Sequence, residues 1–273
     1  MRKFIFVLLT LLLVSPFSFA MKGIIWQPQN RDSQVTDTQW QGLMSQLRLQ
    51  GFDTLVLQWT RYGDAFTQPE QRALLFKRAA AAQQAGLKLI VGLNADPEFF
   101  MHQKQSSAAL ESYLNRLLAA DLQQARLWSA VPGVTPDGWY ISAEIDDLNW
   151  RSEAARQPLL TWLNNAQRLI SDVSAKPVYI SSFFAGNMSP DGYRQLLEHV
   201  KANTLKQPAL MSGYRMAAAW INLPLNSVNV IYRPAPIAKV PPLPAALFMN
   251  CLSPAKAKPL QRNRNRMQRS PRC

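Results

Sequence analysis

The chain has few of the residues that build metal centres and disulfide frameworks. Its 273 residues include two cysteines and two histidines, and both cysteines, Cys251 and Cys273, lie near the C-terminus. Neither cysteine is placed to crosslink the body of the fold, and no Cys/His spacing matches a metal site. The sequence therefore predicts no metal and no cofactor.

A long apolar run is also missing. The run at Phe4–Val14 is eleven residues long and is soon followed by Pro16, whereas a membrane-spanning helix needs roughly 20 apolar residues. A basic start at residues 1–3 and a small-x-small ending at Ser18–Ala20 complete the pattern of a secretory signal. We predict that residues 1–20 are a signal peptide cleaved after Ala20. The mature protein is then periplasmic or secreted, with no stable membrane anchor.

Acidic residues are absent from the last sixty positions. Residues 214–273 hold ten Lys/Arg, nine of the nineteen prolines and no Asp or Glu. The net charge of +13 is a property of this tail, because residues 21–213 hold 18 basic and 17 acidic side chains. Charge is thus no argument for a polyanion partner of the body, and we predict no nucleic-acid partner. Nucleic-acid or membrane binding by the tail stays an alternative, and it requires Lys/Arg along one face of an ordered element.

Two explanations account for the basic, Pro-rich tail at 213–273. Disorder is the ordinary one. The other is a change of reading frame: read from the third base of the Gly213 codon, the codons of residues 213–222 permit V-Q-D-G-S-G-V-D-K. The same shift over residues 246–251 permits G-I-V-Y-E-L, in which the Glu is forced. Because the same shifted frame permits a credible protein sequence in both segments, the sequence favours a frameshift beyond about residue 212.

The body alternates β-rich runs with helical stretches. The runs are at 23–26, 52–59, 87–93, 138–142, 177–182 and 209–211. Capping boxes at Thr36-x-x-Gln39 and Thr67-x-x-Glu70 open helices, amphipathic stretches cover about 105–130 and 153–174, and Ser189-Pro190 opens a helix to about residue 205.

Such β/α repetition predicts a parallel sheet. An open doubly wound sheet and a closed barrel both fit, but no Gly-rich phosphate loop follows the first run, which disfavours the dinucleotide-binding version. We predict an α/β fold in which residues 21–212 form a (β/α) TIM-type barrel. It is incomplete, with about five to six β/α units, and an irregular C-terminal tail follows it.

A barrel of this type carries its site at the carboxyl ends of the strands. Those ends supply aromatic, amide and carboxylate side chains. Aromatic faces stack on sugar rings, and amides and carboxylates bind sugar hydroxyls, so we predict a carbohydrate or polysaccharide ligand. The alternative for each aromatic side chain is a place in the core. The candidate substrate-binding residues are Trp26, Gln27, Gln58, Trp59, Asn94, Asp96, Asp146, Asp147, Phe183 and Phe184.

Glu144 is the candidate catalytic residue. It follows an apolar run and precedes Asp146 and Asp147, and a cluster of partly buried carboxylates raises pKa values. A raised pKa suits a general acid. The alternatives are a salt bridge from Glu144 to Arg61 or Arg151, and a helix-capping or cation-binding role for the two aspartates. For His102 and His199 we expect structural or surface roles.

Three segments carry a family resemblance: Gly23-Ile-Ile-Trp-Gln-Pro, Gly51-Phe-Asp-Thr-Leu-Val-Leu-Gln-Trp and Gly138-Trp-Tyr-Ile-Ser-Ala-Glu-Ile-Asp-Asp-Leu-Asn-Trp. They resemble the bacterial glycoside-hydrolase-like barrels of the domain-of-unknown-function family numbered 4434, over about residues 22–190. The resemblance implies a barrel, a carbohydrate substrate class and an acid/base Glu after the fourth strand, which is Glu144. It also implies a nucleophile after the seventh strand, yet no Asp or Glu follows Glu198.

The sequence thus predicts an exported glycoside-hydrolase-like protein that acts on or binds a polysaccharide and is inactive in this chain through loss of its later strands. A non-catalytic periplasmic carbohydrate-binding protein is the alternative. A second carboxylate about 5–10 Å from Glu144 would separate the two.

Overall fold

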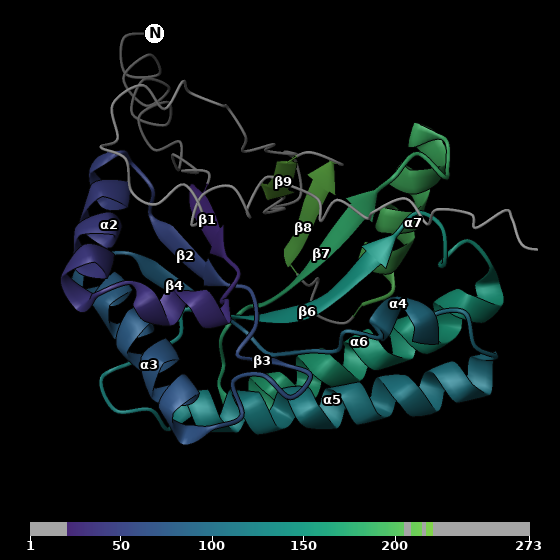
Figure 1. The fold of residues 1–273 in the computed structure, drawn as a ribbon. Coiled ribbons are helices and arrows are strands. Elements are labelled where there is room, and N and C mark those ends of the chain that lie inside the picture. The colour runs from purple at the N-terminus through teal and green to yellow at the C-terminus, as the bar shows by residue number, and fades with distance from the viewer. Residues whose placement is uncertain (1–20, 205–208, 215–216, 221–273) are drawn as a thin grey trace, which may run out of the picture.

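A curled parallel sheet forms the centre of the molecule (Figure 1). The structure, a computed structural model, describes residues 21–204, 209–214 and 217–220, so the predicted signal peptide and most of the tail lie outside the described residues. Consecutive strands pair in parallel, in the order of the chain. They are β1 (Gly23–Trp26), β2 (Thr54–Leu57), β4 (Lys88–Gly92), β6 (Gly138–Asp146), β7 (Val178–Phe184) and β8 (Ala209–Tyr214).

Helices connect these strands and cover one face of the sheet (Figure 1). A curled parallel sheet with its helices outside is an incomplete TIM-type barrel, which confirms the predicted fold class. The two short elements η1 (Asn30–Gln34) and α4 (Phe99–His102) were not predicted. The long helices are α2 (Asp37–Leu49), α3 (Pro69–Gln84), α5 (Ser107–Ser129), α6 (Glu153–Val173) and α7 (Pro190–Ala202).

The described part of the sheet ends with two strands at its C-terminal edge. Strand β8 continues to Tyr214, and β9 (Ala217–Trp220) pairs with it antiparallel. Antiparallel neighbours need only a tight turn, whereas a parallel neighbour needs a crossover of a dozen or more residues. Within the described residues β8 is therefore the last parallel strand of the sheet, and β9 pairs with it antiparallel. Both cysteines lie outside the described residues.

Side chains alternate between the two faces of the sheet. Leu55 and Leu57 of β2 belong to the main core, which packs against the helices, whereas Val56 joins a smaller cluster with Ile90 and Tyr140. Five tryptophans are almost fully buried in the main core and supply large apolar area: Trp40, Trp128, Trp139, Trp150 and Trp162. We call the side of the sheet opposite the helices, which carries Val56, Ile90 and Tyr140, the inner face.

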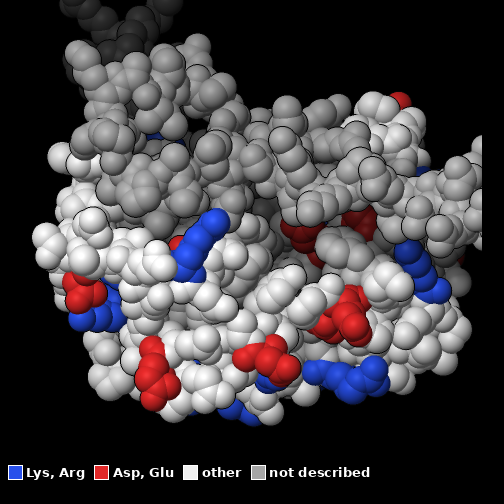
Figure 2. All heavy atoms as spheres, viewed as in Figure 1, with Lys and Arg blue, Asp and Glu red and all other residues white. Residues whose placement is uncertain are grey.

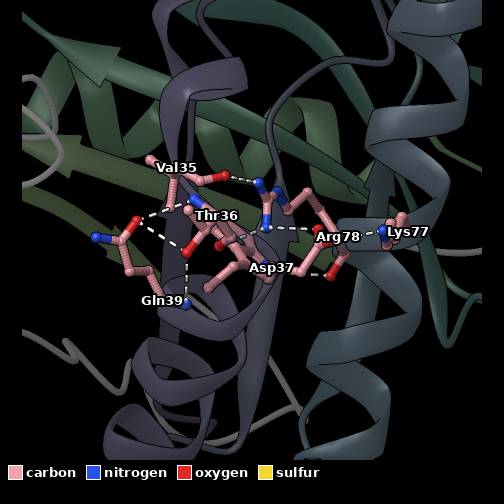
Figure 3. Close-up of polar contacts among 7 residues, drawn as sticks. Val35, Thr36, Asp37, Gln39, Lys77 and Arg78 are labelled. Carbon is pink, nitrogen blue, oxygen red and sulfur yellow. Dashed lines mark hydrogen bonds and ion pairs between the residues drawn. The ribbon is translucent and has the colours of Figure 1, made fainter.

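Helix α2 begins as predicted and is tied to α3 (Figure 3). The Thr36 hydroxyl accepts a hydrogen bond from the Gln39 backbone N–H at 3.3 Å, and the Gln39 side chain accepts one from the Thr36 N–H at 2.9 Å. Arg78 of α3, only 2% exposed, donates to the Val35 carbonyl and, at 3.2 Å, to the Thr36 carbonyl. Lys77 pairs with Asp37 at the same junction. Arg78 therefore satisfies carbonyls that precede the helix.

The structure confirms one of the other two predicted helix starts and contradicts the other. Ser189 caps α7, since its hydroxyl accepts from the Gly192 N–H at 3.1 Å, and this confirms the Ser189-Pro190 start. The capping box at Thr67-x-x-Glu70 is wrong. Helix α3 begins at Pro69 with Gln68 as its N-cap, while the Thr67 hydroxyl donates backwards to the Asp64 carbonyl. Proline suits the first helical position and fixes the start there.

Charge is spread thinly over the face drawn in Figure 2. Basic and acidic side chains occur there as small separate groups, with no continuous basic area among the described residues. No helix in the described ranges has the length and apolarity that a membrane crossing requires.

Candidate functional site

A β-bulge in β6 places Glu144. The ladder between β6 and β7 pairs Ile141 with Ile180 and next pairs Glu144 with Ser181, so Ser142 and Ala143 are extra residues in β6. Bulges re-aim side chains and are frequent beside active sites. The predicted strand ended at residue 142, whereas β6 runs to Asp146 and holds Glu144 within the strand.

A chain of hydroxyl groups leads to the Glu144 carboxyl on the inner face. The Tyr140 hydroxyl donates to Ser181 Oγ at 2.9 Å, and the Ser181 side chain hydrogen-bonds Glu144. Burial raises the pKa of Glu144, the Ser181 hydrogen bond offsets part of that effect, and the nearby charge of Asp146 raises the pKa further. Burial and the Glu144 charge likewise raise the pKa of Tyr140. The site therefore favours a proton on the Glu144 carboxyl.

Asp146 shapes the turn that ends β6. Its Oδ1 accepts from the Leu148 N–H at 2.8 Å and the Asn149 N–H at 2.6 Å, and its Oδ2 accepts from Asn149 Nδ2 at 2.8 Å. The side chain is 5% exposed. Both oxygens are thus engaged in a local turn at residues 146–149. Asp146 does not cap the following helix, since α6 begins at Glu153 with Ser152 as its N-cap.

Asp147 holds the loop between β7 and α7. Its carboxylate accepts from the N–H groups of Ala185, Asn187 and Met188 at 2.6–3.2 Å and from Asn187 Nδ2 at 3.1 Å. Burial would raise the pKa of Asp147, but these hydrogen bonds outweigh it and hold the pKa below its ordinary value. The side chain is fully buried, so its role in this structure is to order the loop.

Two of the predicted aromatic side chains face the helices and not the inner face. Trp26 Nε1 donates to Asp32 Oδ2 at 3.0 Å, and its ring lies 4.5 Å from that of Trp40 in the core. Phe184 packs against Tyr193 of α7 with ring centroids 5.0 Å apart. Neighbouring residues of a strand point to opposite faces, which explains why residues that share one end of the sheet do not share one cleft.

The remaining aromatic and amide candidates stay half-buried at the strand ends: Gln27, Gln58, Trp59 and Phe183. The Gln58 carbonyl accepts from Ser142 Oγ at 2.7 Å, which ties the end of β2 to the bulge in β6. The Trp59 ring lies 4.9 Å from Tyr62, and its Nε1 is buried with no hydrogen-bond partner among the described residues. Trp26 and Phe184 therefore lie on the helix side of the sheet, apart from the inner-face carboxyl of Glu144.

Asn94 and Asp96 line a pocket of about 330 Å³ beside the strand ends. Strands β3 (Arg61–Tyr62) and β5 (Asn94–Ala95) pair in parallel there and form one wall, and α4 and α5 supply side chains of the other. Asp96 accepts from the Tyr113 hydroxyl at 2.8 Å and from the Glu98 N–H at 2.8 Å.

A second hollow of about 510 Å³ lies between residues 103–110 and 148–155. Gln103, which lines it, donates to the Glu144 carbonyl at 3.5 Å and accepts from Asn149 Nδ2 at 2.6 Å. Gln103 therefore connects the second hollow to the backbone at Glu144. Gln103, Ser181 and Tyr113 were not predicted, since an isolated polar residue carries no local sequence pattern.

The contacts of the two histidines are with residues other than Glu144. His102 stacks on Tyr113, with ring centroids 4.0 Å apart and planes at 17°, and it lies 3.8 Å from Glu98. His199 contacts Asn203 at the end of α7. Among the described residues, no three His, Cys, Asp or Glu side chains are placed to hold a metal ion.

The chain belongs to the family described as Domain of unknown function (DUF4434), which matches residues 21–211. This confirms the family resemblance. The chain is 98% identical over 202 residues to the uncharacterized protein YbcH of Escherichia coli (strain K12). That match covers 74% of this chain and 68% of YbcH.

Two solved structures are similar in part. One is GH5_18 from Streptomyces cattleya in complex with Manb1-4GlcNAc, with a TM-score of 0.41 and 10% identity over 60% of this chain. The other is Fpglu1 from Fervidobacterium pennivoraus, with a TM-score of 0.41 and 15% identity over 65% of this chain. The chain spans about half the length of each, 45% and 50% respectively.

Proposed function

We propose that this type of barrel acts on a carbohydrate with Glu144 as its general acid/base, and that this chain itself binds the carbohydrate without hydrolysing it. The observation that carries the proposal is the Glu144 carboxyl on the inner face at the carboxyl end of the sheet, with a raised pKa and a hydrogen bond to Ser181. A general acid must hold its proton near neutral pH until it gives it to the leaving oxygen. Glycoside hydrolases achieve this with a buried carboxyl group.

A glycoside hydrolase needs a second carboxylate opposite the first, about 5–5.5 Å away in retaining enzymes and about 6.5–9.5 Å away in inverting ones. Asp146 is the carboxylate that raises the pKa of Glu144, but its two oxygens are occupied by the turn at 148–149. The sequence has no Asp or Glu after Glu198. Our proposal for this chain is therefore carbohydrate binding without hydrolysis, the activity belonging to longer members of the family.

Two further parts of the proposal concern the ends of the chain. We infer export by the segment at 1–20 from its basic, apolar and small-residue parts. We also infer that the sequence beyond about residue 212 is frameshifted. The match to YbcH supports this, because 98% identity over 202 residues leaves about a quarter of this chain unmatched.

The test uses this chain and YbcH, each purified and incubated with a panel of bacterial polysaccharides. We expect YbcH to hydrolyse one of them and this chain to bind the same polymer without cleaving it. Glu144→Gln at the corresponding position of YbcH should lower kcat by about 10²–10⁴ while the polymer still binds.

The matched control is Glu111→Gln, an exposed glutamate of α5, which should leave kcat unchanged. Full activity of the Glu144→Gln variant of YbcH would overturn the acid/base assignment. Hydrolysis by this chain would overturn the proposal that it only binds.

A further inference from the structure

We propose that the 330 Å³ pocket beside the strand ends binds a sugar residue that carries a carboxylate. The inference rests on the proposed function, since it names the class of carbohydrate, but it concerns a different set of side chains. The volume falls in the range of small-molecule sites. Its lining includes Arg61, Asp64, Asn94, His102, Tyr113 and Arg116.

Two guanidinium groups reach this pocket with donors to spare. Arg61 donates from Nε to the Gly63 carbonyl at 2.9 Å, and among the described residues its terminal nitrogens make no hydrogen bond or ion pair. Arg116 lies 6.0 Å from the centre of the Tyr113 ring and has no ion pair within the described ranges. Guanidinium groups bind carboxylates through paired hydrogen bonds. The guanidinium groups of Arg61 and Arg116 are therefore available to bind a carboxylate in this pocket.

Among the described residues, the acidic groups near the pocket form no ion pair with these two arginines. Asp96 has one oxygen on the Tyr113 hydroxyl and the other on the Glu98 N–H. Asp64 is exposed at the rim. Behind the pocket wall, Asp121 is fully buried and accepts from the Asn94 N–H at 2.9 Å. Burial raises the pKa of Asp121 well above its ordinary value, which favours the uncharged form of this carboxyl.

The other lining groups suit the remainder of a sugar. Asn94 and the rim carboxylate of Asp64 provide amide and carboxylate partners for hydroxyls, and the stacked rings of His102 and Tyr113 form an aromatic wall. The loop that follows Arg61 holds Phe66 at φ 62°, a left-handed conformation that a bulky side chain rarely adopts. Such strain is kept where the surroundings impose it, often at ligand sites.

The pocket lies at the same end of the sheet as the proposed acid, next to residues that contact the backbone of β6. His102 lines it, and the next residue, Gln103, donates to the Glu144 carbonyl at 3.5 Å. One residue, Leu93, separates β4 from β5. Its backbone N–H donates a hydrogen bond to the Tyr140 carbonyl at 2.9 Å. An acidic residue of a polysaccharide held here would lie at the same end of the sheet as Glu144.

The test measures binding to the full chain by titration calorimetry with three acidic sugars, galacturonate, glucuronate and N-acetylmuramate. Each is compared with its neutral counterpart, galactose, glucose or N-acetylglucosamine. We expect one acidic sugar to bind at least tenfold more tightly than its counterpart. Arg61→Gln and Arg116→Gln should each weaken that binding about tenfold, whereas Arg168→Gln, on the exposed face of α6, should not.

Thermal melting of each variant checks that the fold is retained. Equal affinity for acidic and neutral sugars, no binding of any acidic sugar, or unchanged affinity in both arginine variants would overturn the inference. Those outcomes leave the proposed function standing if YbcH hydrolyses a neutral polymer through its Glu144 equivalent. Conversely, Arg-dependent binding of an acidic sugar would support the pocket even if Glu144 proves inactive.

Discussion

Ser181 and Glu144 lie opposite each other across the ladder between β7 and β6, and their side chains are hydrogen-bonded. The bulge at Ser142 and Ala143 creates this pairing, because it delays β6 by two residues relative to β7. Ser181 in turn accepts from the Tyr140 hydroxyl at 2.9 Å. The position and the proton affinity of Glu144 therefore depend on the register of two strands.

Glu144→Gln should alter how stability depends on pH. Because the pKa of Glu144 is raised in the folded state, the native protein keeps a proton that the unfolded chain has already released. The free energy of unfolding then falls as pH rises from the ordinary glutamate value to the raised one, and this contribution is constant above it. Glutamine has no such charge to bury, so the variant should melt at a higher temperature than the parent at pH 7–8.

Melting curves between pH 4 and pH 8 provide the measurement. Parent and Glu144→Gln should converge at the acidic end, where the parent carboxyl is protonated in both states. The exposed Glu111→Gln variant should follow the parent throughout. A parent-like pH profile for Glu144→Gln would show that the carboxyl is solvated and ionised like an ordinary surface glutamate.

Asp147→Asn should destabilise the protein by roughly 2–4 kcal/mol. The aspartate accepts four hydrogen bonds from the loop at 185–188, and an amide cannot accept all of them, so buried donors lose their partners. Urea unfolding measures the loss. Asp191→Asn, at an exposed position in the first turn of α7, should change stability by less than about 0.5 kcal/mol. An equally small effect at Asp147 would contradict its role in holding the loop.

Trp26→Phe separates a core role from a sugar-binding role. The change removes the indole N–H that donates to Asp32 at 3.0 Å and leaves a buried acceptor, which should cost about 1–2 kcal/mol. Polysaccharide affinity should stay at the parent value. If affinity falls while the melting temperature is unchanged, Trp26 contacts the ligand and its packing against Trp40 is not its main role.

Gly92→Ala should be strongly destabilising because the backbone of the neighbouring strand leaves no room for a side chain. A Cβ at Gly92 would lie 2.1 Å from the Gln58 carbonyl oxygen and 2.3 Å from its carbon, so β2 and β4 would have to separate. We expect a loss of about 3 kcal/mol or more, since overpacking of a well-packed site costs roughly 1–3 kcal/mol even without a backbone clash.

Gly42→Ala is the matched control for Gly92→Ala. Gly42 lies within α2, and a Cβ there would meet no atom within 4 Å. Alanine in a helix interior should stabilise by about 0.5–1 kcal/mol relative to glycine. Equal melting temperatures for Gly92→Ala and the parent would mean that β2 and β4 approach less closely than the structure shows.

The order and type of the main elements could be predicted because apolar runs and helix caps are local signals. Parallel strands buried on both faces are continuous apolar runs, and Lys88–Gly92 is one of them. The end of β6 was missed because Ser142, Glu144 and Asp146 make the sequence polar, although the strand continues through a bulge. Phe66 and the two-residue strands β3 and β5 depend on tertiary contacts and leave no local pattern.

The candidate site was predicted in part. Collecting residues from the strand ends identified Glu144 and the pocket residues Asn94 and Asp96, but it treated both faces of each strand as one. Alternation along β1 sends Trp26 to the helices, and the sequence pattern could have indicated this. The contacts of Gln103 with Glu144 and Asn149 join segments 41 and 46 residues apart, a distance over which a single sequence gives no guidance.

The sheet order, in which each strand follows its chain predecessor, has a consequence for how the protein is made. In the seven-stranded sheet, each of the strands β2, β4, β6, β7 and β8 pairs with a strand that is synthesised before it, so these ladders can form from the N-terminus onward. Shortening such a series from its C-terminal end leaves all earlier ladders intact and moves only the final edge. The fold thus grows unit by unit along the chain, and its first units do not wait for its last.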